Sequence, residues 1–297
     1  MERRKIRLLW TGGWDSTFRM VQLSHMEGVE VQPVYITGTR KPNVEQEMRA
    51  IRRIWRALME KLPKCRFHHV EYIEMEKDFA VPRKFDEAYR RLQERFPALG
   101  RQYRMLGAYA ALHPGVELGE EHYYEKPGTL YSIFNAVGGL RFDGDGIGHL
   151  PGTVLDPDIR LLFGNYSFPI ARYREVEMKE MVKKWHDEDV MAHVWFCQEP
   201  IHGKPCGCCV PCQIKMKAHM DFLLPEESQK RYRAFKTIEA QGPEKAEAFR
   251  RFLKGEEEQG LAFMAGLSRW WKTEEVQKEK ERLEKEIQEF RKIMACA

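Results

Sequence analysis

Short apolar segments alternate with longer amphipathic segments through the first part of the chain, and this alternation limits the fold more than any other feature. The segments that read as buried strands lie at residues 6–10, 29–37 and 66–73. The segments with helical periodicity lie at residues 15–26, 44–62 and 101–112. Strands that alternate with helices of this length form parallel sheets covered by helices on both faces. We therefore expect an α/β fold with a twisted parallel sheet.

Two later regions of the chain have a different character. Residues 120–165 are rich in glycine and aromatic residues and show little periodicity, so we expect a long functional loop or insertion there. After Cys212 the composition shifts to Glu, Lys, Arg and Gln, which predicts a helical C-terminal extension at residues 221–297. An apolar stripe near its end could pack on its own domain or on a partner, and it consists of Leu283, Ile287, Phe290 and Met294.

The composition is that of a globular protein in water. The 297 residues are 43% hydrophobic and 32% charged, with a net charge of +4. The chain has no apolar run of about 18 residues and no apolar core of a signal peptide near its start. We therefore expect a cytoplasmic protein with no membrane contact. The mild basic excess gives little support for a nucleic-acid partner.

A glycine-containing turn follows the first expected strand and precedes the first expected helix. It reads Thr11-Gly12-Gly13-Trp14-Asp15-Ser16-Thr17. Glycine allows a close approach of the backbone, and a helix N-terminus favours phosphate, with hydroxyl groups as further donors. An ordinary turn capped by Asp15 or Ser16 would explain the same residues. Its place on the first strand of an α/β pattern favours a ligand site.

Two better-known phosphate loops do not match this turn. A Walker A loop needs a lysine after its second conserved glycine, but Trp14 stands after Gly13. A dinucleotide-binding loop needs separated glycines after a strand. The later glycine-rich segment 144–148 lacks a clear preceding strand, and it lacks the carboxylates that a calcium loop needs at its fifth and twelfth positions.

Five of the seven cysteines fall between residues 197 and 212. Four of them follow a C-x8-C-x2-C-x2-C pattern, which suits a tetrahedral, structural zinc site, and these are Cys197, Cys206, Cys209 and Cys212. Cys208 could replace Cys209, and His202 could replace one thiolate. An iron–sulfur cluster is the rival occupant, because it also binds cysteine thiolates.

The glycine turn resembles the S-G-G-x-D-S motif of the PP-loop ATP pyrophosphatases, with Thr11 in place of the first serine. Together with the four cysteines, it makes residues 5–220 resemble 7-cyano-7-deazaguanine synthase. Two weaker matches are Gly100-Arg101-Gln102, similar to the family's G-R-N, and Val194-Trp195-Phe196-Cys197, similar to T-W-S-C. The resemblance implies a PP-loop domain, of the adenine nucleotide α-hydrolase kind, over residues 1–220.

The family resemblance also implies an activity. A 7-carboxy-7-deazaguanine-like acid would be adenylated by ATP with Mg²⁺ and captured by ammonia or another amine, giving an amide or a nitrile with release of AMP and pyrophosphate. This is the reaction of an ATP-dependent ligase. The implied catalytic residues are Asp15, Ser16 and Arg101. The implied ATP contacts are Thr11, Gly12, Gly13, Trp14, Asp15, Ser16, Thr17 and Thr37.

The chain departs from the family in three places. Thr39-Arg40-Lys41 stands where the family has a Q-R-H-type segment, and Glu120-Glu121-His122-Tyr123 stands where the family's substrate-bordering segment is expected. Residues 221–297 lie beyond the family's usual end. ATP and zinc chemistry therefore carry over better than substrate identity.

Several alternatives stay open. The activated acid could pass to an amine on a protein, or the chain could be a PP-loop enzyme that thiolates tRNA. It could also be a non-catalytic protein that binds a partner. A homodimer, and a protein partner bound through the C-terminal helices, are compatible with the sequence.

Overall fold

The computed structural model describes residues 3–38, 43–75, 77–122, 130–256, 259–263 and 274–297. By its internal contacts the chain divides into two compact units, Met1–Trp195 and Phe196–Ala297. This division places the cysteine segment with the C-terminal helices, whereas the motifs predict a functional domain that ends at residue 220; that functional boundary stays a prediction. The segment Thr39-Arg40-Lys41 and residue Tyr123 lie outside the described residues.

A parallel sheet forms the centre of the first unit. Its strands are β1 (Arg4–Leu9), β2 (Val29–Thr37), β3 (Arg66–Phe67), β4 (Glu71–Glu74), β5 (Val116–Leu118) and β8 (Tyr166–Ser167). The order is β3-β2-β1-β5-β8, with β4 also paired to β2, and every pair is parallel. The chain therefore winds outward from β1 in both directions, and the winding reverses between β1 and β5.

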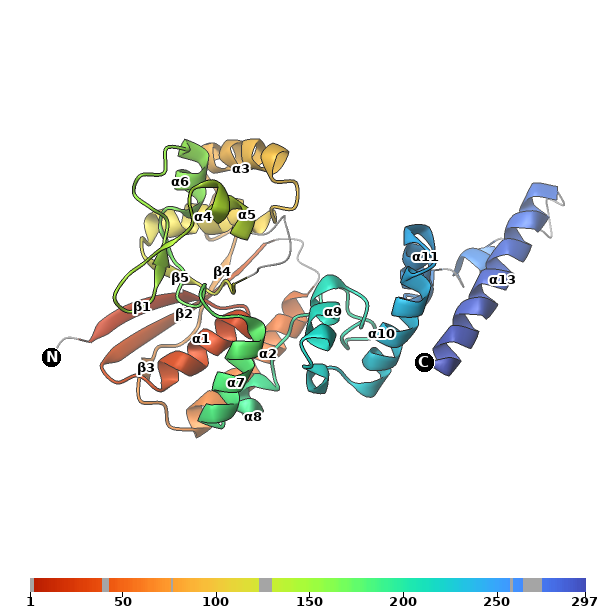
Figure 1. Cartoon of the computed structure of the whole chain (residues 1–297), viewed down its shortest axis with the longest axis horizontal. Helices are drawn as coiled ribbons and strands as arrows, with labels where there is room; N and C mark the ends of the chain where they lie inside the picture. The colour runs from red at the N-terminus through yellow and green to blue at the C-terminus, as the bar shows by residue number, and fades with distance from the viewer. Residues whose placement is uncertain (1–2, 39–42, 76, 123–129, 257–258, 264–273) are drawn as a thin grey trace. The chain divides into compact units, whose positions relative to one another are not determined.

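Helices cover both faces of this sheet, as Figure 1 shows. One layer is formed by α1 (Trp14–Ser24), α2 (Val44–Glu60), α7 (Glu175–Trp185) and α8 (Glu188–Met191). The other layer contains α3 (Arg83–Arg95), α4 (Gln102–Leu112) and α6 (Pro157–Phe163). The buried side chains Phe85, Tyr109 and Phe163 lie in the core of the second layer. The expected α/β fold with a parallel sheet flanked by helices is confirmed.

The strand expected at residues 66–73 is divided in the structure. β3 pairs with Glu30 and Val31 of β2, and β4 pairs with residues 34–37 of the same strand. The break lies opposite Pro33, which has no N–H to give to a ladder. The side-chain amide of Gln32 donates instead to the carbonyl of His69, at 2.8 Å. A proline in β2 therefore accompanies a gap in its neighbour.

The expectation of a long loop at residues 120–165 is wrong where the described residues form helices and strands. The segment contains α5 (Leu130–Ala136) and a hairpin of β6 (Arg141–Phe142) and β7 (Gly148–His149), besides α6. In the hairpin turn, the Asp143 carboxylate accepts hydrogen bonds from the backbone N–H groups of Asp145 and Ile147, at 3.0 and 2.9 Å. Gly144 and Gly146 thus belong to a tight turn.

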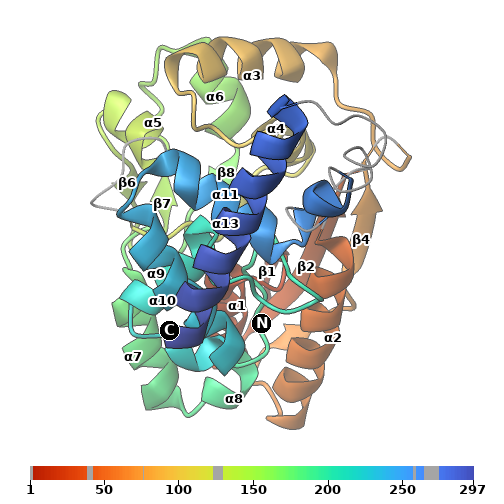
Figure 2. The ribbon, with the colours of Figure 1, turned by 90° about the vertical axis from the view of Figure 1, so that its right-hand side faces the viewer.

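The second unit is helical after the cysteine segment. Its elements are α9 (Val210–Lys217), the short 3₁₀ turn η1 (Asp221–Leu223), α10 (Glu226–Glu239), α11 (Pro243–Leu253) and α13 (Glu274–Cys296). Figure 2 shows α13 alongside α10 and α11, which it contacts. Leu283, Ile287 and Phe290 are buried, and the Phe290 ring lies 5.3 Å from that of Phe249. The apolar stripe of α13 therefore packs on its own unit.

Among the described helices, none is both long enough and apolar enough to span a lipid bilayer.

Candidate functional site

The glycine turn lies at the carboxyl end of β1, beside the point where the winding of the sheet reverses. Gly12 has a φ of +71°, and a Cβ at this position would lie 3.2 Å from Cγ1 of Ile51 on α2. Helix α1 begins at Trp14 with Gly13 as its N-cap residue, and no side chain caps it. The expectation of Asp15 or Ser16 as the N-cap residue is therefore wrong.

Two neighbouring hydroxyl groups in this turn have different environments. The side chain of Thr17 is fully buried, and its Oγ1 accepts a hydrogen bond from the indole of Trp10 at 3.0 Å. Ser16 is only 7% exposed, and its Oγ has no hydrogen-bond partner among the described residues. A buried hydroxyl without a partner costs about 1–3 kcal/mol. Ser16 thus has a donor that a bound anion could use, while Thr17 is held in the core.

The carboxyl end of β5 packs directly against the start of α1. A Cβ on Gly119 would lie 3.0 Å from the backbone N and Cα of Ser16, so only glycine fits without a shift. Arg19 of α1 and Glu117 of β5 form a buried bidentate ion pair, with N–O distances of 2.8 and 2.7 Å. This pair fixes α1 on β5 and brings the two strand ends together.

Acidic and phenolic groups gather around these strand ends. Burial and the nearby Asp15 carboxylate raise the pKa of Glu120 to about 8. Burial, reinforced by Glu120, raises the pKa of Tyr103 well above its usual value. The Tyr166 hydroxyl of β8 is buried without a hydrogen-bond partner among the described residues. Carboxylate oxygens such as those of Asp15 and Glu120 suit a hard divalent cation such as Mg²⁺, because Mg²⁺ prefers oxygen ligands.

The remaining predicted ATP-site residues are distributed around the same edge of the sheet. Thr37 is the last residue of β2, paired with Glu74. Arg101 is exposed at the residue before α4, and α4 begins at this edge because it leads into β5. Trp14 is buried in the first turn of α1. Motif reasoning did not identify Glu120 as an acidic partner of Asp15, nor Tyr103 and Tyr166, because only the sheet order brings these residues together.

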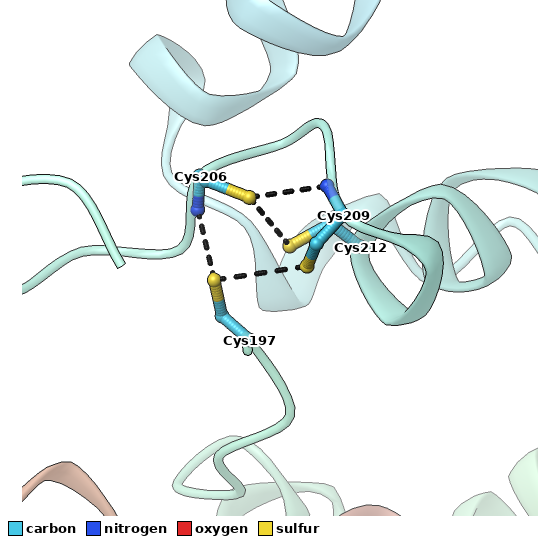
Figure 3. Close-up of side chains that lie close together, drawn as sticks. All are labelled: Cys197, Cys206, Cys209 and Cys212. Atoms are coloured by element: carbon cyan, nitrogen blue, oxygen red, sulfur yellow. Dashed lines mark hydrogen bonds between the residues drawn. The ribbon is translucent and has the colours of Figure 1, made fainter. Parts of the chain in front are cut away.

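The second candidate site lies within the second unit, where four cysteines converge (Figure 3). The sulfur atoms of Cys197, Cys206, Cys209 and Cys212 all lie within 4.8 Å of one another, and all four residues are buried. The Sγ–Sγ distances are 3.8 Å for Cys197 and Cys209 and 3.9 Å for Cys206 and Cys212. Zn–S bonds of about 2.3 Å in a regular tetrahedron place sulfurs about 3.8 Å apart. The four residues could therefore hold a metal ion such as zinc.

Backbone N–H groups point at these sulfurs. Cys206 N donates to Sγ of Cys197 at 3.1 Å, and the N–H groups of Cys208 and Cys209 donate to Sγ of Cys206 at 3.3 and 3.2 Å. Hydrogen bonds of this kind stabilise thiolates over thiols. The neighbouring thiol of Cys197 also helps to lower the pKa of Cys206, to about 7. The N–H groups around Cys206 therefore favour deprotonated sulfur at this residue, the form that binds metals.

The two alternative ligands lie outside the cluster. The Sγ of Cys208 points to the backbone carbonyl of Arg231, at 3.7 Å, and burial raises the pKa of its thiol. His202 is exposed on the turn between the first two ligands and is not a member of the cluster. The structure brings together the four cysteines that the spacing predicted.

Helix α10 supports the cysteine loop. Oγ of Ser228 donates to the carbonyl of Pro205 at 2.6 Å, and the guanidinium of the buried Arg231 donates to the same oxygen at 3.2 Å. Gly207 has a φ of +83°, and a Cβ there would lie 2.2 Å from the carbonyl oxygen of Ser228. The loop and α10 therefore pack so closely that only glycine is accommodated at residue 207.

No family model matches this chain, and none of the curated proteins is significantly similar to it.

Proposed function

We propose that this protein is an ATP-dependent ligase of the PP-loop kind, which adenylates a carboxylic acid and transfers the acyl group to an amine. The observation that carries the proposal is the uncapped glycine turn at the carboxyl end of β1, with the buried Ser16 hydroxyl that has no hydrogen-bond partner in the described part of the chain. It lies where the winding of a parallel sheet reverses, which is the usual ligand position in folds of this class.

In this proposal the glycine turn holds the pyrophosphate portion of ATP. Backbone N–H groups at the start of α1 and the Ser16 hydroxyl donate to phosphate oxygens. Asp15 and Glu120 are the residues that would hold Mg²⁺, which neutralises phosphate charge when it is bound. The turn lacks a P-loop lysine, and this fits because the held group is the leaving group. Arg101 is available to contact a phosphate or the substrate carboxylate.

The reaction then proceeds in two displacements. A carboxylate oxygen of the acid attacks the α-phosphorus, and pyrophosphate leaves. An amine then attacks the acyl carbon of the adenylate. AMP leaves and carries away the carboxylate oxygen that had attacked the phosphorus, and the nitrogen loses a proton, which gives an amide. With ammonia as the amine, the amide oxygen would attack a second ATP with loss of pyrophosphate, and loss of AMP and of the two N–H protons would then give a nitrile. The protein mainly orients these groups and stabilises their charge.

A 7-carboxy-7-deazaguanine-like acid is the proposed substrate, because the glycine turn and the C-x8-C-x2-C-x2-C pattern occur here in the order typical of that family. Zinc is the proposed metal, and its role is structural because four thiolates leave no open coordination position. The mass of the product identifies the amine and shows whether an amide or a nitrile is formed.

The test uses the full-length protein with ATP, Mg²⁺, 7-carboxy-7-deazaguanine and ammonium. Chromatography measures the nucleotides, and mass spectrometry identifies the amide or nitrile formed from the acid. We expect one AMP for each amide or two for each nitrile. Asp15→Asn should lower AMP formation at least a hundredfold. Asp145→Asn, a matched change on the exposed hairpin turn, should leave it unchanged.

Three results would contradict the proposal. ADP as the product would indicate transfer of the γ-phosphate. AMP formation that requires tRNA, in a brown iron–sulfur protein, would indicate a thiolation enzyme. The absence of nucleotide turnover with every amine donor would leave a non-catalytic binding protein.

A further inference from the structure

A groove of about 740 Å³ runs along α2 beside strand β4, in the first unit. Among the described strands β4 pairs with β2 alone, so it lies at the edge of the sheet. The lining of the groove contains two arginines, Arg52 and Arg56, two aromatic residues, Trp55 and Tyr72, and one acidic residue, Glu60. None of them is among the residues proposed to hold ATP.

Two aromatic rings form part of the groove and are supported from behind. Trp55 packs edge-on against Phe67, with ring centroids 5.9 Å apart, and lies 6.4 Å from Trp10. Tyr72 packs edge-on against Tyr35 at 6.0 Å, yet 47% of its surface is exposed. Both rings are therefore held in place while part of their surface remains open to a ligand.

Two arginines on α2 line the same groove. Arg52 and Arg56 are exposed and lie one helical turn apart, on the same face of the helix. Neither forms an ion pair with an acidic group of the described residues. Arg49, three residues before Arg52 on the same helix, does pair with Glu45. The Arg52 charge also acts on the Tyr72 hydroxyl, where it opposes the rise in pKa caused by burial.

We propose that this groove binds single-stranded nucleic acid, with Arg52 and Arg56 at successive phosphates and with Trp55 and Tyr72 stacked on bases. A basic groove with exposed aromatic rings is the usual surface for this ligand. An acidic peptide would use the arginines but would not need the two rings. The lining follows α2 from Ile51 to Glu60, which suits an extended strand better than a compact mononucleotide. A net charge of +4 is compatible with a local basic surface of this size.

The test measures binding of a fluorescein-labelled ten-nucleotide single-stranded RNA to the full-length protein by anisotropy, over a range of salt concentrations. The double variant R52A/R56A should weaken binding at least tenfold and reduce the salt slope by about 1.4, which is the contribution of two phosphates in a single strand. Tyr72→Ala should weaken binding at least fivefold, and Tyr72→Phe should retain it, because the stacking face remains.

Arg53→Ala is the matched control. Arg53 is an exposed arginine on the same helix that does not line the groove, so its loss should change binding less than twofold. Arg52, Arg53 and Arg56 are exposed, so the thermal melts of the arginine variants should match that of the wild type. The groove substitutions should also leave AMP formation unchanged, which separates this inference from the proposed function.

Four outcomes would overturn the inference. The wild type could fail to bind micromolar RNA, or R52A/R56A could bind it as tightly as the wild type does. A glutamate-rich peptide could bind with equal affinity, which would leave the aromatic rings without a role. A concentration-dependent dimer that R52A/R56A dissociates would instead make this surface an interface between two copies of the chain.

Discussion

Cys208 and Cys209 are adjacent in sequence but have different environments. The Cys209 sulfur is part of the four-sulfur cluster, while the Cys208 sulfur points to the carbonyl of Arg231. We expect Cys209→Ala to lose the metal, and with it several kcal/mol of stability in the second unit. Cys208→Ala should keep one zinc per chain and lose only about 1–2 kcal/mol of packing. Elemental analysis of the purified variants measures this difference. A Cys208→Ala variant without metal, or a Cys209→Ala variant that keeps it, would contradict the prediction.

Glu120 makes stability depend on pH. Its pKa in the folded protein is about 8, well above its value of roughly 4.3 in an unfolded chain. Between these two pH values, the folded state therefore binds a proton that the unfolded state does not. The resulting stability is fully present below the lower value and is lost as pH rises through the higher one.

Glu120→Gln removes this titration, so the variant should gain stability relative to the wild type between pH 5 and pH 9, by about 1–2 kcal/mol after allowance for partial exposure. Urea unfolding without Mg²⁺, followed by fluorescence, gives the comparison. The exposed Glu188→Gln should show the same pH dependence as the wild type. A pH profile of Glu120→Gln that runs parallel to that of the wild type would show that folding does not raise the pKa of Glu120.

At the level of elements, the fit between the cysteine loop and α10 depends on Gly207. Gly203 offers a matched comparison, because it also has a positive φ but has no atom within 4 Å of an added Cβ. Gly203→Ala should cost about 1 kcal/mol of backbone strain. Gly207→Ala adds a clash with the Ser228 carbonyl and should cost at least ~3 kcal/mol with weakened zinc binding. Chelator-resistance assays and thermal melts test this; equal effects would mean that the loop moves freely away from α10.

The elements that could be predicted from sequence are those set by local pattern. Strands β1 and β2 and helices α1 and α2 follow directly from periodicity, and the cysteine cluster follows from spacing within one loop. The hairpin at residues 141–149 was not predicted, because its turn depends on how the Asp143 carboxylate folds back on later N–H groups. The break between β3 and β4 depends on a side chain of the neighbouring strand, Gln32.

At the scale of the whole molecule, the part that sequence could not predict is the meeting of distant segments. The order β2-β1-β5 brings Glu120 beside Asp15 and packs Gly119 on Ser16, and no local pattern contains that order. The same holds for the support that α10 gives to the cysteine loop. The grouping of that loop with the C-terminal helices likewise follows from packing and not from motif order.

The central claim is that ATP is cleaved at its α-phosphorus by a carboxylate oxygen of the substrate. Isotope transfer tests this most directly. The full-length protein would turn over ATP with 7-carboxy-7-deazaguanine labelled with ¹⁸O in both carboxyl oxygens, and mass spectrometry would analyse the AMP formed. The account predicts one ¹⁸O atom in each AMP. AMP free of ¹⁸O, or ADP in its place, would contradict it.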